Sequence, residues 1–385
     1  MDLTPPAPSP PSTGFGTRCV HAANAPDLNT GAIVQPLHLA TTFERDADGG
    51  YPRGFRYGRE GTPNRTALEA CVAELEGGVA AVAFSSGLAA NLAILEQLSS
   101  GDHVVASREG YHGTHRQLRE IVARRGVTVE FIDATDTAEL KRAVNSRTRL
   151  VWLESPANPM LSITDLARAA EIAHARGAMV VCDSTFATPY CQRPIEAGVD
   201  VVIHSGTKYF GGHSDVMSGF AIVGTDRELA ARVLEWQSLA GAVLAPFDCW
   251  LLRRSISTLG LRMQRQCANA FELAQWLSSH AGVERTLYPG LPAHPGHAIA
   301  RRQMPGGFGA MISVCVRGDA ARALNVAGRT QLFRRATSLG GVESLIEHRA
   351  SIEGPASTTP PNLLRLSIGI EDARDLREDL AQALS

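Results

Sequence analysis

The chain has almost no net charge, no long apolar stretch and no paired cysteine motif. Lysine and arginine number 37 against 39 aspartates and glutamates in 385 residues, which gives a formal net charge of −2. Such a balance gives no bulk attraction for nucleic acid or for an anionic membrane. The longest apolar stretches, such as Ala80–Phe84, fall far short of the roughly 20 residues that span a bilayer. We therefore expect neither nucleic acid nor a membrane among the partners.

The cysteines and the N-terminal residues point to a cytoplasmic protein. Seven cysteines are scattered along the chain and are never spaced as C-x-x-C, so we expect free thiols, no disulfide framework and no metal site. The first residues, MDLTPPAPSPPSTGFG, are rich in proline and serine and have neither the basic start nor the apolar core of a signal peptide. We expect them to form a disordered leader.

Length and composition predict two or three domains with a large buried core. A domain usually has about 100–200 residues, and hydrophobic residues make up 44% of this chain. Up to about residue 60, many Pro, Gly, Thr and Arg residues indicate an extended arm with one short helix at most. An α/β pattern then continues to about Ala245. We expect an arm at 1–60, a large domain at 61–245 and a C-terminal domain at 246–385.

Helical segments alternate with short β-branched runs from Leu68 onward. This alternation predicts an α/β fold with a mainly parallel sheet and helices on both faces. After residue 245 we expect a long helical stretch over 247–279, a smaller antiparallel sheet and a covering helix over 373–384. The expected strands of the large sheet are AAVAF, HVVAS, VTVEFID, RLVWLES, AMVVCDS, DVVIHSG and GFAIVG, and those of the small one lie in VERTLYP, GAMISVCVRG, QLFRRATSLGG and LLRLSIGIED.

The segment DVVIHSGTKYFGGHSD carries the strongest chemical signal. An apolar strand ends there in Ser205, Gly206, Thr207 and Lys208. A lysine in this place can form a Schiff base while the hydroxyl groups bind a phosphate. Taken alone, the motif is equally compatible with an ordinary exposed loop lysine.

Two further strand ends provide groups that suit the same cofactor. Asp183 ends the strand AMVVCD, where a carboxylate could pair with a protonated pyridine nitrogen. The strand AAVAF is followed by Ser86, Gly87 and Leu88 at a helix start, which is an anion site. Taken singly, Asp183 is better interpreted as a cap and Gly87 as a turn residue. Together, the amine, the carboxylate and the phosphate cradle specify pyridoxal phosphate.

The sequence resembles the pyridoxal-phosphate enzymes of cysteine and methionine metabolism from about Thr17 to the C-terminus. The resemblance implies fold type I, with a mainly parallel sheet in a large domain and a smaller α/β C-terminal domain. It also implies that Lys208 carries the cofactor, that Asp183 pairs with its ring nitrogen, and that Ser205 and Thr207 bind its phosphate with the amides of Gly87 and Leu88. The motifs that carry it are YGREGTPNRTALE, ELEGG, SSGLAA, YHGTHR, ESPANP, CDSTFATP, HSGTKYFGGHSDV, SLGGVESLI and LLRLSIGIED.

Three residues nearer the N-terminus have further roles by the same resemblance. Tyr111 matches the tyrosine that stacks on the cofactor ring and takes part in proton transfer. Tyr57 and Arg59 match a pair that reaches the phosphate of a neighbouring subunit. The resemblance therefore implies a homotetramer, assembled as a dimer of dimers with shared active sites.

Residues of the C-terminal part are expected to bind the substrate. Arg365 matches the arginine that binds the α-carboxylate, a task suited to a planar bidentate donor. Ser338 and Asn158 would complete the contacts to the carboxylate and to the ring oxygen. His204 and His213 flank the lysine loop, and we expect both to make structural hydrogen bonds.

The resemblance leaves the substrate open. It implies γ-replacement or γ-elimination on homoserine-type or sulfur amino acids, and Arg116 favours the cystathionine γ-synthase and γ-lyase pair. Thr337 stands where these two enzymes usually carry an acid, Gly113 stands where methionine γ-lyases have cysteine, and the loop over 348–362 is short and proline-rich. A homoserine sulfhydrylase, or a γ-lyase for methionine or another γ-substituted amino acid, is the alternative. From another class, a catalytically silent regulator is disfavoured by the retained site residues.

Overall fold

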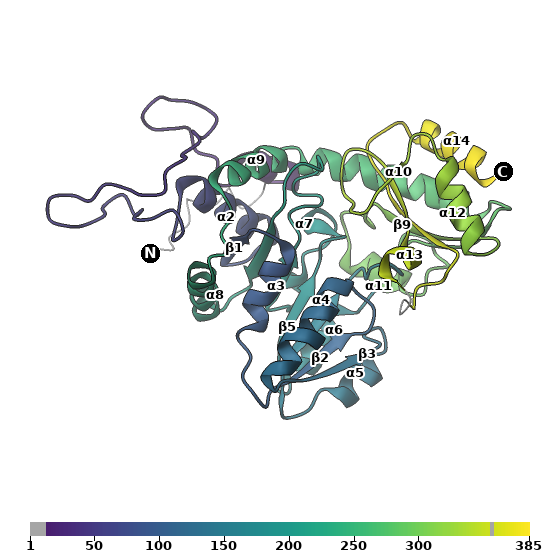
Figure 1. Cartoon of the computed structure of the whole chain (residues 1–385), viewed down its shortest axis with the longest axis horizontal. Coiled ribbons are helices and arrows are strands. Elements are labelled where there is room, and N and C mark those ends of the chain that lie inside the picture. Colours follow the sequence, from purple (N-terminus) through teal and green to yellow (C-terminus); the bar gives the residue numbers. More distant parts are fainter. Residues whose placement is uncertain (1–12, 355–357) are drawn as a thin grey trace.

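The computed structural model describes residues 13–354 and 358–385 (Figure 1). Most of the predicted disordered leader, and part of the loop over 348–362, lie outside the described residues. The leader prediction is wrong from Phe15 onward, because helix α1 spans Phe15–His21. Phe15 packs edge-on against Tyr190 at 5.5 Å between ring centroids, and this contact anchors the helix.

An extended arm follows α1, as predicted. Between Ala22 and Thr62 the described chain forms turns and one isolated bridge, Thr42 to Tyr57, without helix or ladder. Its loops project from the body of the molecule (Figure 1). Apolar side chains on the arm face solvent in the single chain, most of all Leu28 and Leu39, which are 99% and 74% exposed.

A seven-stranded sheet forms the centre of the larger part. Its order is β1-β7-β6-β5-β4-β2-β3, and only β7 runs against the other strands. The prediction of a mainly parallel sheet is therefore confirmed. The strands are β1 Ala80–Phe84, β2 His103–Ser107, β3 Thr128–Ile132, β4 Thr148–Glu154, β5 Met179–Asp183, β6 Val201–His204 and β7 Gly219–Val223.

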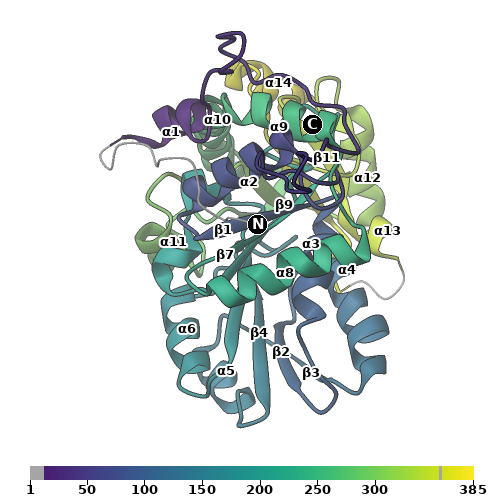
Figure 2. The same cartoon turned by 90° about the vertical axis from the view of Figure 1, so that its left-hand side faces the viewer.

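Helices cover both faces of this sheet (Figure 2). Apolar residues of α3, the 112–125 segment and α8 pack on one face, and those of α2, α5 and α6 pack on the other. The helical elements are α2 Pro63–Glu76, α3 Gly87–Leu95, α4 His112–Arg116, π-helix η1 Gln117–Val122, 3-10 helix η2 Ala123–Arg125, α5 Thr137–Ala143, α6 Leu166–His174, α7 Thr188–Cys191, 3-10 helix η3 Pro194–Ala197 and α8 Arg227–Ala240.

The helical stretch predicted over 247–279 is present, but it is divided into two helices. The structure has two helices, α9 (Pro246–Ile256) and α10 (Leu259–Ser278). At the break, the Arg262 guanidinium donates to the carbonyl of Ser255 at 3.0 Å and to the Thr258 hydroxyl at 3.2 Å. These side-chain bonds replace backbone bonds of a continuous helix, which apolar spacing alone does not reveal.

The smaller sheet has the order β10-β11-β12-β9-β8 and is antiparallel except for the parallel pair β10 and β11. The segment predicted as a strand over 331–341 forms only two strand residues, and β11 was not predicted. The covering helix at the C-terminus is present. The elements are β8 Val283–Leu287, α11 His297–Gln303, β9 Met311–Val316, α12 Ala320–Arg329, β10 Arg334–Arg335, β11 Leu345–His348, α13 Arg349–Glu353, β12 Leu363–Ser367 and α14 Ala373–Leu384.

Two expectations from composition can be compared with this fold. All seven cysteines are buried free thiols. Among the helices that the structure describes, none is both long and apolar enough to cross a membrane. The domain boundaries at residues 60 and 245 stay predictions, although α9 begins directly after the second of them.

Candidate active site

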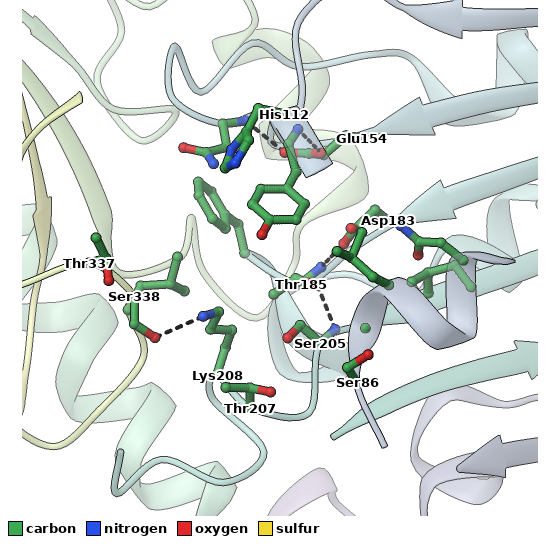
Figure 3. A pocket seen from close by; sticks show the side chains of 18 of the residues that line it. Ser86, His112, Glu154, Asp183, Thr185, Ser205, Thr207, Lys208, Thr337 and Ser338 are labelled. Atoms are coloured by element: carbon green, nitrogen blue, oxygen red, sulfur yellow. Dashed lines mark hydrogen bonds between the residues drawn. The ribbon is translucent and has the colours of Figure 1, made fainter. Parts of the chain in front are cut away.

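A cavity of about 410 Å³ lies where the large sheet meets the small one. Strands β1, β4, β5 and β6 point the same way, so their carboxyl ends meet at one edge and form one wall. The 337–339 segment, α13 and β12 form the other. Residues that line it include Ser86, Gly87, Leu88, Tyr111, His112, Glu154, Asn158, Asp183, Thr185, Ser205, Thr207, Lys208, Thr337, Ser338, Arg349 and Arg365 (Figure 3).

Lys208 extends its amine into this cavity. Its Nζ donates to the Ser338 hydroxyl at 2.8 Å. Burial lowers the pKa of Lys208 from 10.5 to about 8, the positive charge of Arg365 adds to the effect, and Glu347 opposes it. A substantial share of the amine is therefore neutral near neutral pH, which is the form that attacks a carbonyl or accepts a proton.

The predicted phosphate cradle lies at the end of β1. Ser86 caps helix α3, its hydroxyl accepting from the Ala89 amide at 3.2 Å, so the first amides of the helix point into the cavity end. Gly87 packs closely against the lysine segment, because a Cβ there would lie 3.2 Å from the Ser205 Cβ. The Thr207 hydroxyl already donates to the Ser218 carbonyl at 3.1 Å. Hydroxyls and helix amides thus gather at one end of the cavity.

Asp183 lies buried at the end of β5. Its Oδ1 accepts from the Thr185 amide at 3.0 Å, and burial raises the pKa of its carboxyl. The Thr185 hydroxyl in turn accepts from the Ser205 amide at 2.9 Å and so ties β5 to the phosphate end (Figure 3). A buried carboxylate is costly without a cationic partner. A protonated ring nitrogen beside Asp183 would supply one, so the site suits a pyridinium.

Tyr111 precedes helix α4 at the rim of the cavity. Its ring lies against Gly113, where an added Cβ would come within 2.6 Å of the tyrosine Cε1. In the sequence, Gly113 keeps the family pattern beside Tyr111 and stands where methionine γ-lyases have cysteine. In the structure, this glycine makes room for the Tyr111 ring.

Arg365 is hydrogen-bonded to the two other residues, Asn158 and Ser338, that were expected to complete the contacts to the carboxylate and the ring oxygen. Its guanidinium donates to Asn158 Oδ1 at 2.9 Å, to the Ser338 carbonyl at 3.1 Å and to Glu347 Oε2 at 2.6 Å. Ser338 adopts φ +89°, a strained backbone for serine that presents its hydroxyl to Lys208 and its carbonyl to Arg365. The structure therefore brings Asn158, Ser338 and Arg365 together.

Three predicted residues do not line the cavity of the single chain. Arg116 lies on the exposed side of α4, where Glu120 accepts from its guanidinium at 2.9 and 3.0 Å. Tyr57 and Arg59 lie on the arm, and Arg59 donates to the Ser238 carbonyl at 2.8 Å. Because Tyr57 and Arg59 were expected to serve a neighbouring subunit, their roles stay predictions, as does that of Arg116.

Several residues that line the cavity were missed from the sequence, among them His112, Glu154, Thr185 and Arg349. Glu154 ends strand β4, as Asp183 ends β5, so the strand-end criterion that selected Asp183 could have found it. Arg349 is buried and donates to Glu347 Oε2 at 2.9 Å, the same oxygen that Arg365 binds. The register of β11 and β12 places Glu347 opposite Arg365 and so joins both guanidinium groups at one carboxylate.

The two histidines of the lysine loop make the hydrogen bonds expected of them. His204 Nε2 lies 2.9 Å from Glu76 Oε2, and both side chains are fully buried. His213 Nδ1 lies 2.8 Å from the Gly211 carbonyl. Both residues stabilise the segment that carries Lys208.

Comparisons with known proteins find similarity over almost the whole chain. A sequence model of the family described as Cys/Met metabolism PLP-dependent enzyme matches residues 16–385. A cystathionine beta-lyase of Coxiella burnetii is 46% identical, over 96% of this chain and 97% of that protein. A cystathionine gamma-synthase of Mycobacterium bovis is 47% identical, over 97% of each chain. The structure of a cystathionine gamma-lyase of Lactobacillus plantarum, complexed with L-serine, has a TM-score of 0.92 at 37% identity, over 96% of this chain and 98% of that one.

We predict that the covalent link between Lys208 and pyridoxal phosphate forms with a pH dependence set by a pKa of about 8. At pH 7 roughly a tenth of such an amine is neutral, against about one part in three thousand for an ordinary lysine. The initial rate of colour development in cofactor-free protein should therefore rise with pH through a midpoint at about 8 and level off roughly one pH unit higher. Lys208→Ala provides the blank, and a midpoint near 10 would contradict the burial effect.

We predict that Gly113→Ala lowers kcat by about tenfold or more without lowering the melting temperature. The added methyl must displace the Tyr111 ring, whereas alanine itself favours helix. The matched control is Gly16→Ala in helix α1, where nothing lies within 4 Å of the added carbon. Steady-state kinetics and thermal unfolding of both variants measure the effect. Unchanged kcat in Gly113→Ala would show that the ring is free to move.

Proposed function

The chain belongs to the Cys/Met metabolism PLP-dependent enzyme family, with fold type I, and we propose that it catalyses γ-replacement or γ-elimination on homoserine-type or sulfur amino acids. Within that class we favour a cystathionine γ-synthase or γ-lyase. The observation that carries the proposal is the amine of Lys208, which lies in one cavity with Asp183, Tyr111 and Arg365. The named relatives support the same class.

The residues of this chain divide the chemical work between them. When bound, pyridoxal phosphate supplies an electron sink for negative charge that develops at the substrate Cα. Arg365 binds the α-carboxylate. Lys208, with its lowered pKa, accepts the proton from the substrate Cα and donates it again at a later step. Tyr111 assists the protonation of the leaving group. Asp183 keeps the ring nitrogen protonated.

Several other functions remain as alternatives to the cystathionine enzymes. A homoserine sulfhydrylase, or a γ-lyase for methionine or another γ-substituted amino acid, would use the same cofactor residues. The similarity to a protein named cystathionine beta-lyase adds β-elimination to this set. A catalytically silent regulator is disfavoured, because Lys208, Asp183, Tyr111 and Arg365 are all kept.

We also propose a cytoplasmic homotetramer, a dimer of dimers with shared active sites. The arm supports this assembly, because it exposes large apolar side chains that another subunit would cover, among them Leu28, Ile33 and Leu39. Tyr57 and Arg59 lie outside their own cavity, as residues that serve a neighbour must. The seven unpaired thiols support the cytoplasm.

We predict that the wild type accepts several γ-substituted amino acids and that Thr337→Glu shifts its preference toward cystathionine over methionine by about tenfold. Thr337 lines the cavity, and a carboxylate there would attract the second ammonium group of cystathionine. A charged hydrogen bond exceeds a neutral one by roughly 1 kcal/mol or more. The measurement is kcat/KM for cystathionine and methionine in both proteins.

The same assay tests the proposed function through its products. Wild type should be yellow and should release 2-oxobutyrate from cystathionine or methionine, or form a thioether from an acylated homoserine and cysteine. Pyruvate from cystathionine would instead indicate β-elimination. The control for added charge is Thr128→Glu on the exposed end of β3. An unchanged substrate ratio in Thr337→Glu would remove Thr337 from the specificity residues.

We predict that Arg59→Ala and Lys208→Ala, each with little activity, regain activity when their subunits are mixed. If Arg59 serves a neighbour, one hybrid site receives both defects and the other receives none. Turnover after dissociation and reassociation of the mixture measures this. Arg53→Ala, a change at another exposed arm arginine, is the control and should be active alone. A fully active monomer at low concentration would contradict the shared site.

A further inference from the structure

Glu154 is a buried acid that no role assigned above employs. It ends strand β4 beside Asp183, its register partner on β5, and its side chain lines the cavity. Its Oε2 accepts from the Tyr111 amide at 2.7 Å and its Oε1 accepts from the Asn158 amide at 2.8 Å (Figure 3). One carboxylate therefore binds the backbones of two segments that carry proposed site residues.

Each of the two segments carries a residue that is proposed to act near the substrate. Tyr111 brings the aromatic ring to the cavity. Asn158 is held twice, through its backbone by Glu154 and through its Oδ1 by Arg365 at 2.9 Å. A shift of Glu154 would thus be transmitted to the tyrosine ring and to the guanidinium that receives the α-carboxylate.

Glutamate suits position 154 better than glutamine or aspartate, which are closest to it in size and in polarity. A carboxylate offers two acceptor oxygens, one for each amide, whereas glutamine offers one oxygen and two donors. Aspartate is shorter by one methylene. The approach is also close, because a Cβ at Gly110 would lie 3.1 Å from Glu154 Oε2.

Burial of the Glu154 carboxyl group costs free energy of folding. Burial and the nearby Asp183 carboxyl raise the pKa of Glu154 to about 8, while the two amides and Arg365 oppose the rise. Two buried carboxyl groups on adjacent strands destabilise the fold, and such costly arrangements are typical of functional sites. A purely structural link could have used a neutral acceptor at lower cost.

We propose that Glu154 is a positioning residue that clamps the Tyr111 segment and the Asn158 segment to the end of β4. It thereby fixes the aromatic ring and the Arg365 guanidinium relative to the substrate. This inference rests on the roles of Tyr111 and Arg365 in the proposed function.

The test is Glu154→Gln in the full-length, cofactor-loaded protein. The amide leaves one backbone N–H without an acceptor, so the dissociation constant of L-alanine, followed by absorbance, should rise about tenfold or more. L-Alanine is the probe because it has the α-amine and α-carboxylate but no γ-substituent. The visible circular dichroism of the bound cofactor should change as the Tyr111 ring turns.

Thermal unfolding separates positioning from a structural role. Removing one of two adjacent buried carboxyl groups should leave the melting temperature of the cofactor-free protein equal or higher. A lower melting temperature together with unchanged L-alanine affinity and dichroism would overturn the proposal. Glu272→Gln is the control, since this exposed acid lies on α10, which does not line the cavity, and the change should leave every readout unchanged.

Glu154→Asp provides a second variant should the glutamine variant fail to fold. Aspartate keeps the carboxyl group but is shorter by one methylene and cannot reach both amides, so L-alanine binding should weaken again. Wild-type affinity in Glu154→Asp would overturn the clamp. A wild type that binds L-alanine but converts none of the γ-substituted amino acids would overturn the proposed function alone, and the affinities of the variants would still decide the role of Glu154.

Discussion

The hydrogen bonds of Arg365 hold the two sheets together at the cavity. The guanidinium belongs to β12 of the small sheet, yet it binds Asn158, which follows β4 of the large sheet, and it pairs with Glu347 on β11. A buried guanidinium without partners would be strongly destabilising. The wall that receives the carboxylate can therefore exist only when both sheets are packed against each other, and the Lys208 contact to Ser338 depends on the same packing.

The groups that could be predicted from the sequence are those at strand ends. Lys208, Asp183 and Ser86 each follow an apolar run, and parallel strands place such residues at one edge of the sheet. That argument needs only local sequence and the alternation of helices and strands. The motifs around these residues also identified the family and the fold class, and both are confirmed.

The features that could not be predicted depend on contacts between distant segments. Glu154 binds two backbone amides. Every residue except proline has such an amide, so the residue types do not indicate which amides a buried acid binds. The pair of Arg365 with Glu347 requires the register of β12 against β11, a strand too short to recognise. The break at Thr258 depends on Arg262, whose side chain takes the place of backbone donors. The roles of Tyr57 and Arg59 involve a second chain.

The reversed direction of β7 has a consequence for the order of folding. Because β7 is antiparallel to its neighbour β6, the lysine segment over 205–218 connects adjacent strands directly, without a helical crossover. Such local closure costs less chain entropy than contacts between distant segments. The carboxylate wall needs Asn158 and Arg365, which are 207 positions apart in the chain. We therefore expect the lysine loop to assemble early, with its amine accessible to small aldehydes until the small sheet docks.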